Sequence, residues 1–429
     1  MDKLIIKGFA PLSGEVSISG SKNAGLPIIV STLLVHGKSV ITNIPSLVDI
    51  KIMLNFLSYF GAKICFNNSS VIIDTSNLIY KEGNCSFARK IRASILALGP
   101  LLNRFGRASI SLPGGCSIGA RPINLHLDGL KAMGVDIFIE NDLIKAKIGS
   151  SGLNSALINL NFASVGATQH LMTTAVFVNG EVIINNAAKE PEIVDLANAL
   201  KKMGANIYGE GTSNIKISGV NSLNFLNYNL PADRIEASTF IAIAAISGSK
   251  ITLKNIQKNQ FNAIFDVFKK MGCNFKYIID EDSNNNSILL EICGPKKLLS
   301  INLSTDVYPG FPSDMQAQFM ACMTLANGVS YIKENIFENR FMHVSELNRL
   351  GARISINGKY AIVKGVQNLY GTNVIASDLR GSASLVIAAL KANGTTIISR
   401  INHLDRGYVN LEKKLFTLGA NIKRISNCN

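Results

Sequence analysis

The sequence predicts an α/β protein of two domains, each made of three repeated βαβ-type units around buried helices. Three observations support this prediction. One short phrase occurs six times, a second phrase lies ahead of each copy, and an apolar helix precedes the second phrase. Successive copies of the first phrase lie 68 to 79 residues apart. That period is too long for the 20–50-residue repeats of solenoids and suits a compact unit with one inner and one outer helix.

The first phrase reads apolar-x-x-apolar-Gly-x-x-apolar, as in LKKMGANI at 200–207. Its form is typical of the last turn of an amphipathic helix, a glycine C-cap and the start of a strand. The six glycines are Gly61, Gly134, Gly204, Gly272, Gly351 and Gly419.

The second phrase is a glycine followed by a strand-like run, as in GEVIIN at 180–185, and its glycine lies 23 to 28 residues before that of the first phrase. Ahead of it are helices rich in Ala and Ser, for example at 236–245 and 382–390. These helices are apolar on nearly every side, so we expect them to be buried. Each repeat therefore reads helix, strand, helix, strand and often one more strand.

Two domains follow from length, because a single core rarely grows beyond about 250–300 residues. The stretch 221–231 fits the repeat pattern least and is expected to carry one crossing between domains. The N-terminal strand at 4–9 is expected to pair with the last repeat, which puts the second crossing near Ser21. The predicted domains are 22–231, and 1–21 together with 232–429.

Composition narrows the function classes. The net charge of +14 indicates either an anionic ligand or a compositional bias, since Lys, Asn and Ile are all plentiful. Basic residues are dispersed and Trp is absent, which disfavours nucleic acid. The longest apolar runs are far shorter than the ~20 residues of a membrane span, and the first residues lack a signal-peptide pattern. The seven scattered cysteines show no zinc spacing, which favours a reducing cytoplasm and no metal.

The sharpest local signal is LPGGCSIGARP at 112–122. Its glycines and proline predict a loop with backbone N–H groups free for a ligand. Cys116 stands five residues before Arg121, and such a setting lowers a thiol pKa and makes it reactive. The alternative is an inert cysteine in a turn.

A second signal is GSKNAG at 20–25, where a loop enters the first helix. Lys22 at a helix N-terminus suits a phosphate or a carboxylate. The spacing is not that of a Walker motif, and the lysine alone is a weak indication of function.

Polar and charged residues begin the other inner helices, and the repeat places equivalent helix ends on one face of each domain. Asp314 and Ser164 are candidates for ligand contact, with a plain N-cap as the alternative. Arg92 and Arg380 oppose the helix dipole, which an anionic ligand would offset. His343 and His403 are either acid/base groups or structural histidines, and the sequence shows no Ser/His/Asp triad.

At these motifs the chain resembles the UDP-N-acetylglucosamine 1-carboxyvinyltransferases, the enolpyruvyl transferases that begin peptidoglycan precursor synthesis. The resemblance covers the full length. It is carried by SKNAGLP (21–27), RASILALGPL (92–101), LPGGCSIGARP (112–122), SVGAT (164–168), EPEIVDLAN (190–198), FPSDMQAQ (311–318), FENRFMHV (337–344), SDLRGSASL (377–385) and HLDRGY (403–408). The related 5-enolpyruvylshikimate-3-phosphate synthases share the fold but lack the cysteine loop.

The resemblance implies an inside-out α/β barrel in each of two domains and a transfer of enolpyruvate from phosphoenolpyruvate to the sugar 3-hydroxyl, with release of phosphate. The route is addition to a tetrahedral ketal followed by elimination, without a metal or organic cofactor. By resemblance, Cys116 is the general acid and can form a covalent adduct with phosphoenolpyruvate, and Asp314 is the base at the sugar hydroxyl. Lys22 and Arg406 complete the catalytic set.

The implied phosphoenolpyruvate-binding residues are Lys22, Asn23, Arg121, Arg340, Arg380 and Arg406. The implied nucleotide-sugar residues are Asn23, Arg92, Arg121, Pro122, Ile123, Asn124, Leu125, Ser164, Val165, Gly166, Asp314 and Ile336. The chain departs from many relatives at Asn124, where aspartate is usual, at Phe162, at Gly381 and at Gln169–His170, and none of these changes removes a reacting group. The expected partners are the two small-molecule substrates, without nucleic acid or membrane, and the expected state is a monomer. A shikimate-3-phosphate acceptor and a non-catalytic nucleotide-sugar-binding scaffold are the alternatives.

Overall fold

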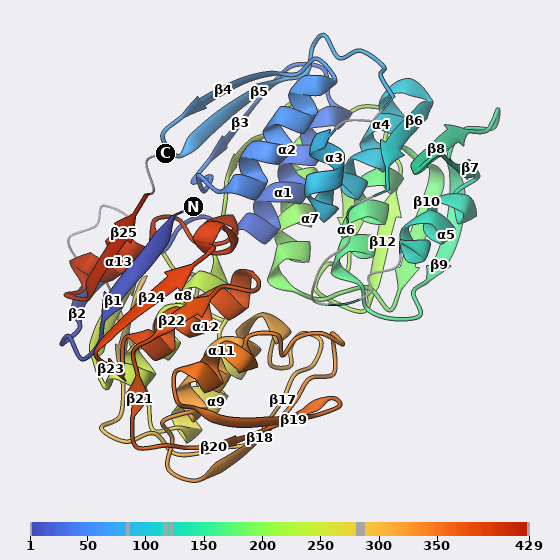
Figure 1. The fold of residues 1–429 in the computed structure, drawn as a ribbon. Helices are drawn as coiled ribbons and strands as arrows, with labels where there is room; N and C mark the ends of the chain where they lie inside the picture. The colour runs from blue at the N-terminus through green and yellow to red at the C-terminus, as the bar shows by residue number, and fades with distance from the viewer. Residues whose placement is uncertain are drawn as a thin grey trace. The chain divides into compact units, whose positions relative to one another are not determined.

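The computed structural model describes residues 2–82, 86–112, 114, 119, 123–279 and 288–426. The chain forms two compact lobes. Lobe 1 comprises Met1–Ser19, Ser117–Ala120 and Ala232–Asn429, and lobe 2 comprises Gly20–Cys116 and Arg121–Pro231. Figure 1 shows the order of the elements along the chain.

Lobe 2 holds the first three repeats. The first contains α1 (Lys22–Ser31), β3 (Lys38–Thr42), α2 (Val48–Tyr59), β4 (Lys63–Asn67) and β5 (Ser70–Asp74). The second contains α3 (Ser86–Lys90), η2 (Arg92–Ala97), α4 (Leu98–Phe105), β6 (Arg107–Ser111), α5 (Asn124–Ala132), β7 (Val135–Glu140) and β8 (Leu143–Ile148), where η denotes a 3-10 helix. The third contains β9 (Asn154–Asn159), α6 (Val165–Thr174), β10 (Asn179–Asn185), α7 (Pro191–Met203), β11 (Asn206–Tyr208) and β12 (Asn214–Ser218), and is followed by β13 (Asn227–Asn229).

Lobe 1 holds the other three repeats and the N-terminal strands β1 (Lys3–Lys7) and β2 (Ser13–Ser17). The fourth contains α8 (Arg234–Ser247), β14 (Lys250–Lys254), α9 (Asn262–Lys270), β15 (Asn274–Ile279), β16 (Ile288–Cys293) and β17 (Leu303–Ser304). The fifth contains η4 (Ser313–Met315), α10 (Gln316–Met323), β18 (Val329–Lys333), α11 (Val344–Arg349), β19 (Arg353–Asn357) and β20 (Tyr360–Lys364). The sixth contains β22 (Asn373–Ile375), α12 (Leu379–Ala389), β24 (Thr395–Ser399), η5 (Ile401–Arg406), α13 (Leu411–Thr417) and β25 (Asn421–Ile425).

The six repeats share one sheet topology, which confirms the predicted α/β fold. In the first repeat the order is β13-β3-β5-β4, with antiparallel pairing among the repeat's own strands and β13 added in parallel to β3. The same order recurs as β9-β10-β12-β11, β2-β14-β16-β15 and β17-β18-β20-β19. The second repeat, β6-β8-β7, keeps the pattern without an added strand among the described residues.

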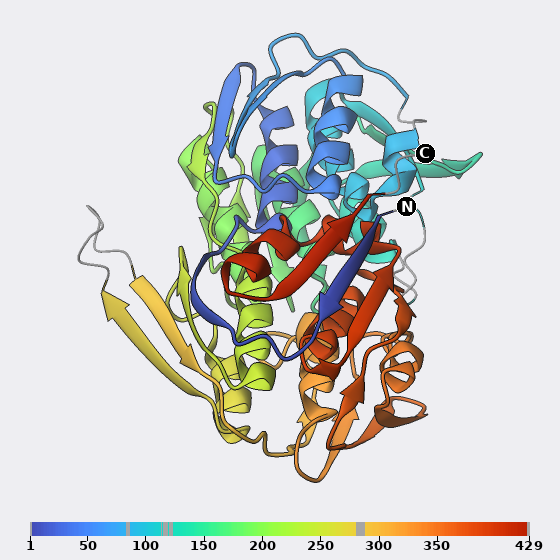
Figure 2. The same cartoon turned by 60° about the vertical axis from the view of Figure 1, so that its left-hand side comes forward.

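The sixth repeat is completed by the other end of the chain. Its sheet has the order β22-β24-β1-β25, and β1 pairs antiparallel with both β24 and β25. Figure 2 shows this blue N-terminal strand between the red strands of the last repeat. The predicted pairing of the N-terminal strand with the last repeat is therefore confirmed.

The glycines of both recurring phrases adopt the backbone conformation that makes glycine favourable. Gly204, for example, has φ of 107° and caps α7, where its N–H donates to carbonyls of the last turn. Every one of the twelve glycines that define the two phrases has a positive φ, a region that side chains with a Cβ disfavour.

The inner helices form the core of each lobe, as their composition predicts. In α8 every residue from Ile235 to Ile246 is buried, and α8, α10 and α12 pack against one another. In lobe 2, α6 packs against both α1 and α4, and the sheets lie around the helices (Figure 1). None of the helices in the described ranges has the length and apolar character needed to cross a bilayer.

A buried ion pair in lobe 1 holds the segment that leads to the crossing near Ser21. Glu236 is 1% exposed; its carboxylate accepts from Lys414 Nζ at 2.7 Å and from the backbone N–H of Ser19 at 2.7 Å. The Ser19 carbonyl accepts from the N–H of Asp233 at 2.8 Å, so the two crossings lie side by side in this lobe. Burial raises the pKa of Glu236, while the Lys414 ammonium and the Ser19 N–H oppose that rise.

We predict that Lys414→Met destabilises the protein by about 3–5 kcal/mol, because it leaves a buried carboxylate without its cation. The measurement is urea unfolding. The loss should be smaller at pH 5 than at pH 8, because a carboxyl whose folded-state pKa is raised is tolerated while protonated and loses stability as pH rises through that pKa. The matched variant Lys414→Met/Glu236→Gln removes the unpaired charge and should recover much of the stability. A double variant no more stable than the single one would contradict this account.

Candidate active site

The centre of the candidate site in lobe 1 is one carboxylate held by two arginines. Arg340 contacts Asp314 Oδ1 at 2.6 Å and Arg380 contacts Oδ2 at 3.2 Å. The two arginine side chains are 4% and 5% exposed, whereas that of Asp314 is 34% exposed. One partly exposed carboxylate is therefore paired with two buried cations.

Local structure explains how these side chains meet. Asp378 caps α12 by accepting from the N–H groups of Arg380 at 3.1 Å and Gly381 at 3.0 Å. Arg380 lies in the first turn, where the helix dipole disfavours a cation, and the Asp314 carboxylate offsets that cost. Arg340 is fixed from the other side, since its Nε and terminal nitrogen donate to the carbonyl of Ser313 at 3.4 and 3.3 Å.

A buried polar network supports Arg380 from behind. Its guanidinium donates to the Tyr408 hydroxyl at 3.2 Å, and that hydroxyl also lies 2.9 Å from Thr239 Oγ1. Gln318 donates to the same hydroxyl at 3.3 Å and to the Asp314 carbonyl at 2.9 Å. Burial lowers the pKa of Arg380, but Asp314 and Tyr408 outweigh burial and the net pKa is raised. Arg380 therefore stays a cation.

Hydrogen bonds to the Glu334 carboxylate, which is 1% exposed, hold the segment after β18 in place. Its Oε1 accepts from the N–H groups of Ile336 at 2.9 Å and Phe337 at 3.2 Å, and Oε2 accepts from Ser313 Oγ at 3.0 Å. The predicted residue Ile336 is thus tied to the residue that precedes Asp314. The predicted residue Arg406 ends η5, which packs against α12.

The two histidines of lobe 1 fit the structural interpretation better than an acid/base role. His343 is 1% exposed, and burial lowers its pKa to about 4 although Asp378 opposes the shift. Burial and the neighbouring arginines also lower the pKa of His403. Both rings are therefore neutral near pH 7.

In lobe 2, Lys22 opens α1 as predicted. Ser21 is the N-cap, and its hydroxyl accepts from the N–H of Ala24 at 3.3 Å. Lys22 Nζ lies 3.2 Å from Asp49 Oδ2, with the two side chains 12% and 7% exposed. The carbonyl of Asn23 accepts from Gln169 of α6 at 3.5 Å, so the starts of the first and third inner helices are linked.

Two further predicted segments meet at the start of α6. Ser164 is its N-cap and accepts from the N–H of Ala167 at 3.3 Å. The first-turn N–H groups of Val165 and Gly166 have no acceptor within the helix, as in every α-helix. Helix α5, which begins at Asn124 and Leu125, packs against α6.

Three predicted residues lie outside the described part of the chain: Cys116, Arg121 and Pro122. Ile123 is described, and its carbonyl accepts from the N–H of His126 at 3.0 Å. In the described ranges, no group of three His, Cys, Asp or Glu side chains is placed to hold a metal ion.

Sequence reasoning missed several residues that support the site. Asp49 lies 27 residues from Lys22, and no local pattern joins the two. Tyr408 lies inside a motif that was recognised for Arg406, so a signal was available. Glu334 could be suspected from its position just before Ile336, where a carboxylate commonly caps backbone N–H groups.

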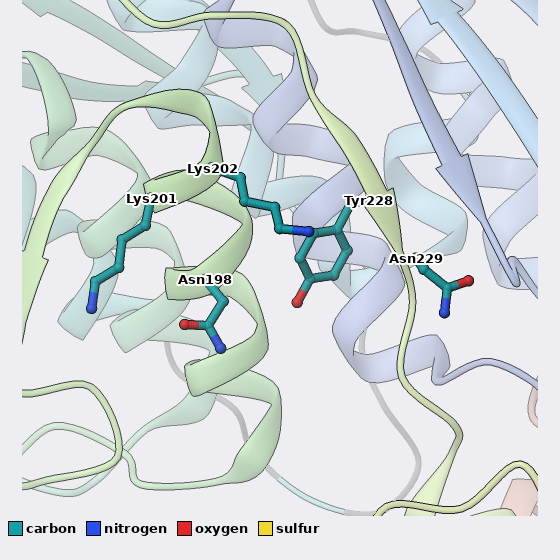
Figure 3. Close-up of a pocket in the computed structure, with 5 residues that line it drawn as sticks. All are labelled: Asn198, Lys201, Lys202, Tyr228 and Asn229. Carbon is teal, nitrogen blue, oxygen red and sulfur yellow. The ribbon is translucent and has the colours of Figure 1, made fainter. Parts of the chain in front are cut away.

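A separate depression of about 530 Å³ lies on lobe 2 and contains none of the predicted site residues. It is lined by Asn198, Lys201, Lys202, Tyr228 and Asn229. Figure 3 shows the Lys202 amine against the ring of Tyr228, 5.1 Å from the ring centre. Burial raises the pKa of Tyr228 to about 12.

Comparison with known proteins places the chain in one family. The model of EPSP synthase (3-phosphoshikimate 1-carboxyvinyltransferase) matches residues 6–415. A protein of Geotalea daltonii named UDP-N-acetylglucosamine 1-carboxyvinyltransferase is 52% identical over 425 residues, covering 99% of this chain and 100% of the relative. A protein of Myxococcus xanthus with the same name is 45% identical, covering 99% of each chain.

Solved structures show the same fold. The enolpyruvyl transferase NikO from Streptomyces tendae has a TM-score of 0.87 at 24% identity, with 99% of both chains covered. EPSP synthase from Acinetobacter baumannii has a TM-score of 0.77 at 18% identity, with 99% of this chain and 100% of that chain covered. With relatives this similar over its whole length, the chain belongs to the EPSP synthase family of carboxyvinyltransferases, and within it to the UDP-N-acetylglucosamine 1-carboxyvinyltransferases.

Proposed function

We propose that this chain transfers the enolpyruvyl group of phosphoenolpyruvate to the 3-hydroxyl of UDP-N-acetylglucosamine and releases phosphate, the first committed step of peptidoglycan precursor synthesis. The observation that carries the proposal is the identity of 45–52% over almost the whole chain with relatives of that name. A shikimate-3-phosphate acceptor is disfavoured, because the EPSP synthase structure is only 18% identical.

The carboxylate of Asp314 suits the role of base. Arg340 and Arg380 fix both of its oxygens in position, and its partial exposure leaves it accessible to a substrate. We assign to it the proton of the sugar 3-hydroxyl as the oxygen attacks C2 of phosphoenolpyruvate. Cys116 delivers a proton to C3 of the same molecule, and loss of phosphate with a C3 proton then restores the double bond.

Phosphoenolpyruvate carries a phosphate and a carboxylate, so its site needs several cations. We assign this task to Lys22, Arg121, Arg340, Arg380 and Arg406, with Asn23 beside the reacting atoms. Lys22 and Arg380 are largely buried and already paired with carboxylates, which holds the cations in place before the substrate binds.

The nucleotide sugar is assigned to the segments around α5 and α6. The N–H groups of Val165 and Gly166 in the first turn of α6 suit its diphosphate, with Ser164 as the N-cap beside them. Residues 121–125 and Arg92 are assigned to the nucleotide, and Asn23, Asp314 and Ile336 to the sugar. Asn124 retains a hydrogen-bonding amide where many relatives have a carboxylate.

We further propose that the protein works as a monomer in the cytoplasm without a cofactor. Scattered cysteines without a metal-binding spacing support a reducing compartment. Size-exclusion chromatography with light scattering tests the monomer directly.

The first test combines phosphate release with labelling. Phosphate should appear from phosphoenolpyruvate only when UDP-N-acetylglucosamine is present. Fosfomycin should add once, because the Cys116 sulfur opens its epoxide by forming an S–C bond and breaking a C–O bond. Intact mass and peptide mapping should place the adduct on Cys116, and Cys116→Ser should remain unlabelled. Adduct formation on the exposed Cys65 instead would contradict the assignment.

We predict that Asp314→Asn lowers kcat by roughly 10²–10⁴-fold, the usual range for losing a positioned acid/base group. Binding of UDP-N-acetylglucosamine should change far less. Asp306→Asn is the matched control, since that exposed side chain lies in the same segment and, among the described residues, accepts only from the neighbouring N–H of Val307. A near-normal kcat for Asp314→Asn would remove the residue from proton transfer.

A further prediction concerns the support of Arg380. Tyr408→Phe removes an acceptor from a buried cation, and hydrogen bonds to charged groups contribute about 1.5–3 kcal/mol. We expect kcat/KM for phosphoenolpyruvate to fall by roughly ten- to a hundredfold. Thr239→Val removes a hydroxyl that contacts Tyr408 but not Arg380, so its effect should be smaller. Equal losses in the two variants would show that packing, not the bond to Arg380, is responsible.

A further inference from the structure

Two buried histidines in lobe 2 are not used by the mechanism above. His126 lies in the first turn of α5 and is 5% exposed, and His170 lies in α6 and is fully buried. Their Nδ1 atoms are 3.2 Å apart, within hydrogen-bonding distance. A pair of imidazoles in direct contact inside a protein needs a defined arrangement of protons.

Backbone contacts determine that arrangement. The N–H of Gly99 donates to His170 Nε2 at 3.0 Å, so this nitrogen carries no proton. In a neutral ring the proton then resides on Nδ1, from which it can only be donated to His126 Nδ1. His126 Nδ1 is therefore the acceptor, and the neutral His126 ring carries its proton on Nε2.

Both rings are neutral near pH 7. Burial, helped by the positive charge of Arg92, lowers the pKa of His126 to about 4. Burial and the neighbouring His126 lower the pKa of His170 well below its usual value. The two tautomers deduced above are thus the relevant ones at working pH.

The protonated edge of His126 lies against the start of α6. A Cβ placed on Gly166 would be 3.4 Å from His126 Cε1 and 3.5 Å from Nε2, so the ring edge is in contact with the first turn of this helix. Within the described part of the chain, Nε2 makes no hydrogen bond. An N–H donor on a largely buried ring therefore stands beside the N–H groups of Val165 and Gly166, near the cation of Arg92.

We propose that His126 Nε2–H is a donor to the diphosphate of the nucleotide sugar, and that His170 is the positioning residue that holds His126 in that tautomer. The inference rests on the proposed function, which places the diphosphate at residues 164–166. Helix N–H groups, a neutral imidazole N–H and Arg92 supply donors of the kind that phosphate oxygens accept.

The neutral donor has a physical advantage over an imidazolium. A charged ring here would lie beside Arg92 in a buried place, and desolvation and repulsion both oppose it. Without His170, however, either nitrogen of a neutral His126 could carry the proton. The tautomer with the proton on Nδ1 would present a lone pair to the phosphate, which repels it.

The test compares His170→Asn with His170→Leu. Both remove the acceptor for the Gly99 N–H, but the Asn side-chain amide can place an N–H close to the position of Nδ1, whereas Leu cannot. We expect His170→Leu to weaken UDP-N-acetylglucosamine binding, measured by titration calorimetry, about tenfold. His170→Asn should stay within about threefold of the wild type. The KM for phosphoenolpyruvate should change little in either variant.

The ring nitrogens of His126 provide a readout that packing alone does not change. Long-range ¹H–¹⁵N correlations should show Nε2–H in the wild type and in His170→Asn, and a mixture of tautomers in His170→Leu. His126→Gln keeps a donor near Nε2 without help from His170, so adding His170→Leu to it should cost little further affinity.

Three results would overturn the inference: a wild-type His126 protonated on Nδ1, equal affinity losses in the Asn and Leu variants, or a full additional loss in the Gln background. Wild type that fails to bind the nucleotide sugar would also overturn it. Failure of the proposed function gives a different result, namely nucleotide-sugar binding without phosphate release, and the affinities and ring spectra would still decide the role of His170.

Discussion

The burial of the inner helices is the constraint on which the rest of the structure depends. Nearly every residue of a helix such as α8 is buried, so a charged group that must reach a ligand is best placed in the first turn. The repeat then brings three such ends together in each lobe. The residues proposed for catalysis accordingly lie at helix starts: Lys22 on α1, Asp314 before α10 and Arg380 on α12.

Burial also determines which charged side chains must be paired at these helix starts. Arg340 and Arg380 are removed from water. Their burial is tolerated because Asp314 pairs with both, the Ser313 carbonyl accepts from Arg340 and the Tyr408 hydroxyl accepts from Arg380. A third contribution comes from the helix cap: Asp378 accepts from the backbone N–H groups of Arg380 and Gly381, while the Arg380 side chain reaches Asp314 and Tyr408. The same side chains that stabilise the core thus arrange the cations that a doubly anionic substrate requires.

Much of this could be predicted from the sequence, because the fold repeats. Six copies of a glycine phrase predicted six helix ends, and the apolar helices ahead of them predicted the core. The pairing of β1 with the last repeat was also predicted, and in the structure β1 lies between β24 and β25. The individual partners were not accessible: Lys22 with Asp49, Arg340 with Asp314, and His126 with His170 each join residues 26 to 44 positions apart. Such pairs depend on how helices pack, which periodicity does not specify.

The closure of the last sheet by β1 affects the order in which the chain can fold during synthesis. Residues 20–231 form lobe 2 from one nearly continuous stretch, so it can fold while the rest is still being made. Lobe 1 has to wait for β25, and at ~5–20 residues per second the last part of the chain takes on the order of 10–40 s to emerge. During that time β1 is a strand without neighbours. It is only five residues long and has an exposed lysine at each end, Lys3 and Lys7, which are features that discourage pairing with other chains.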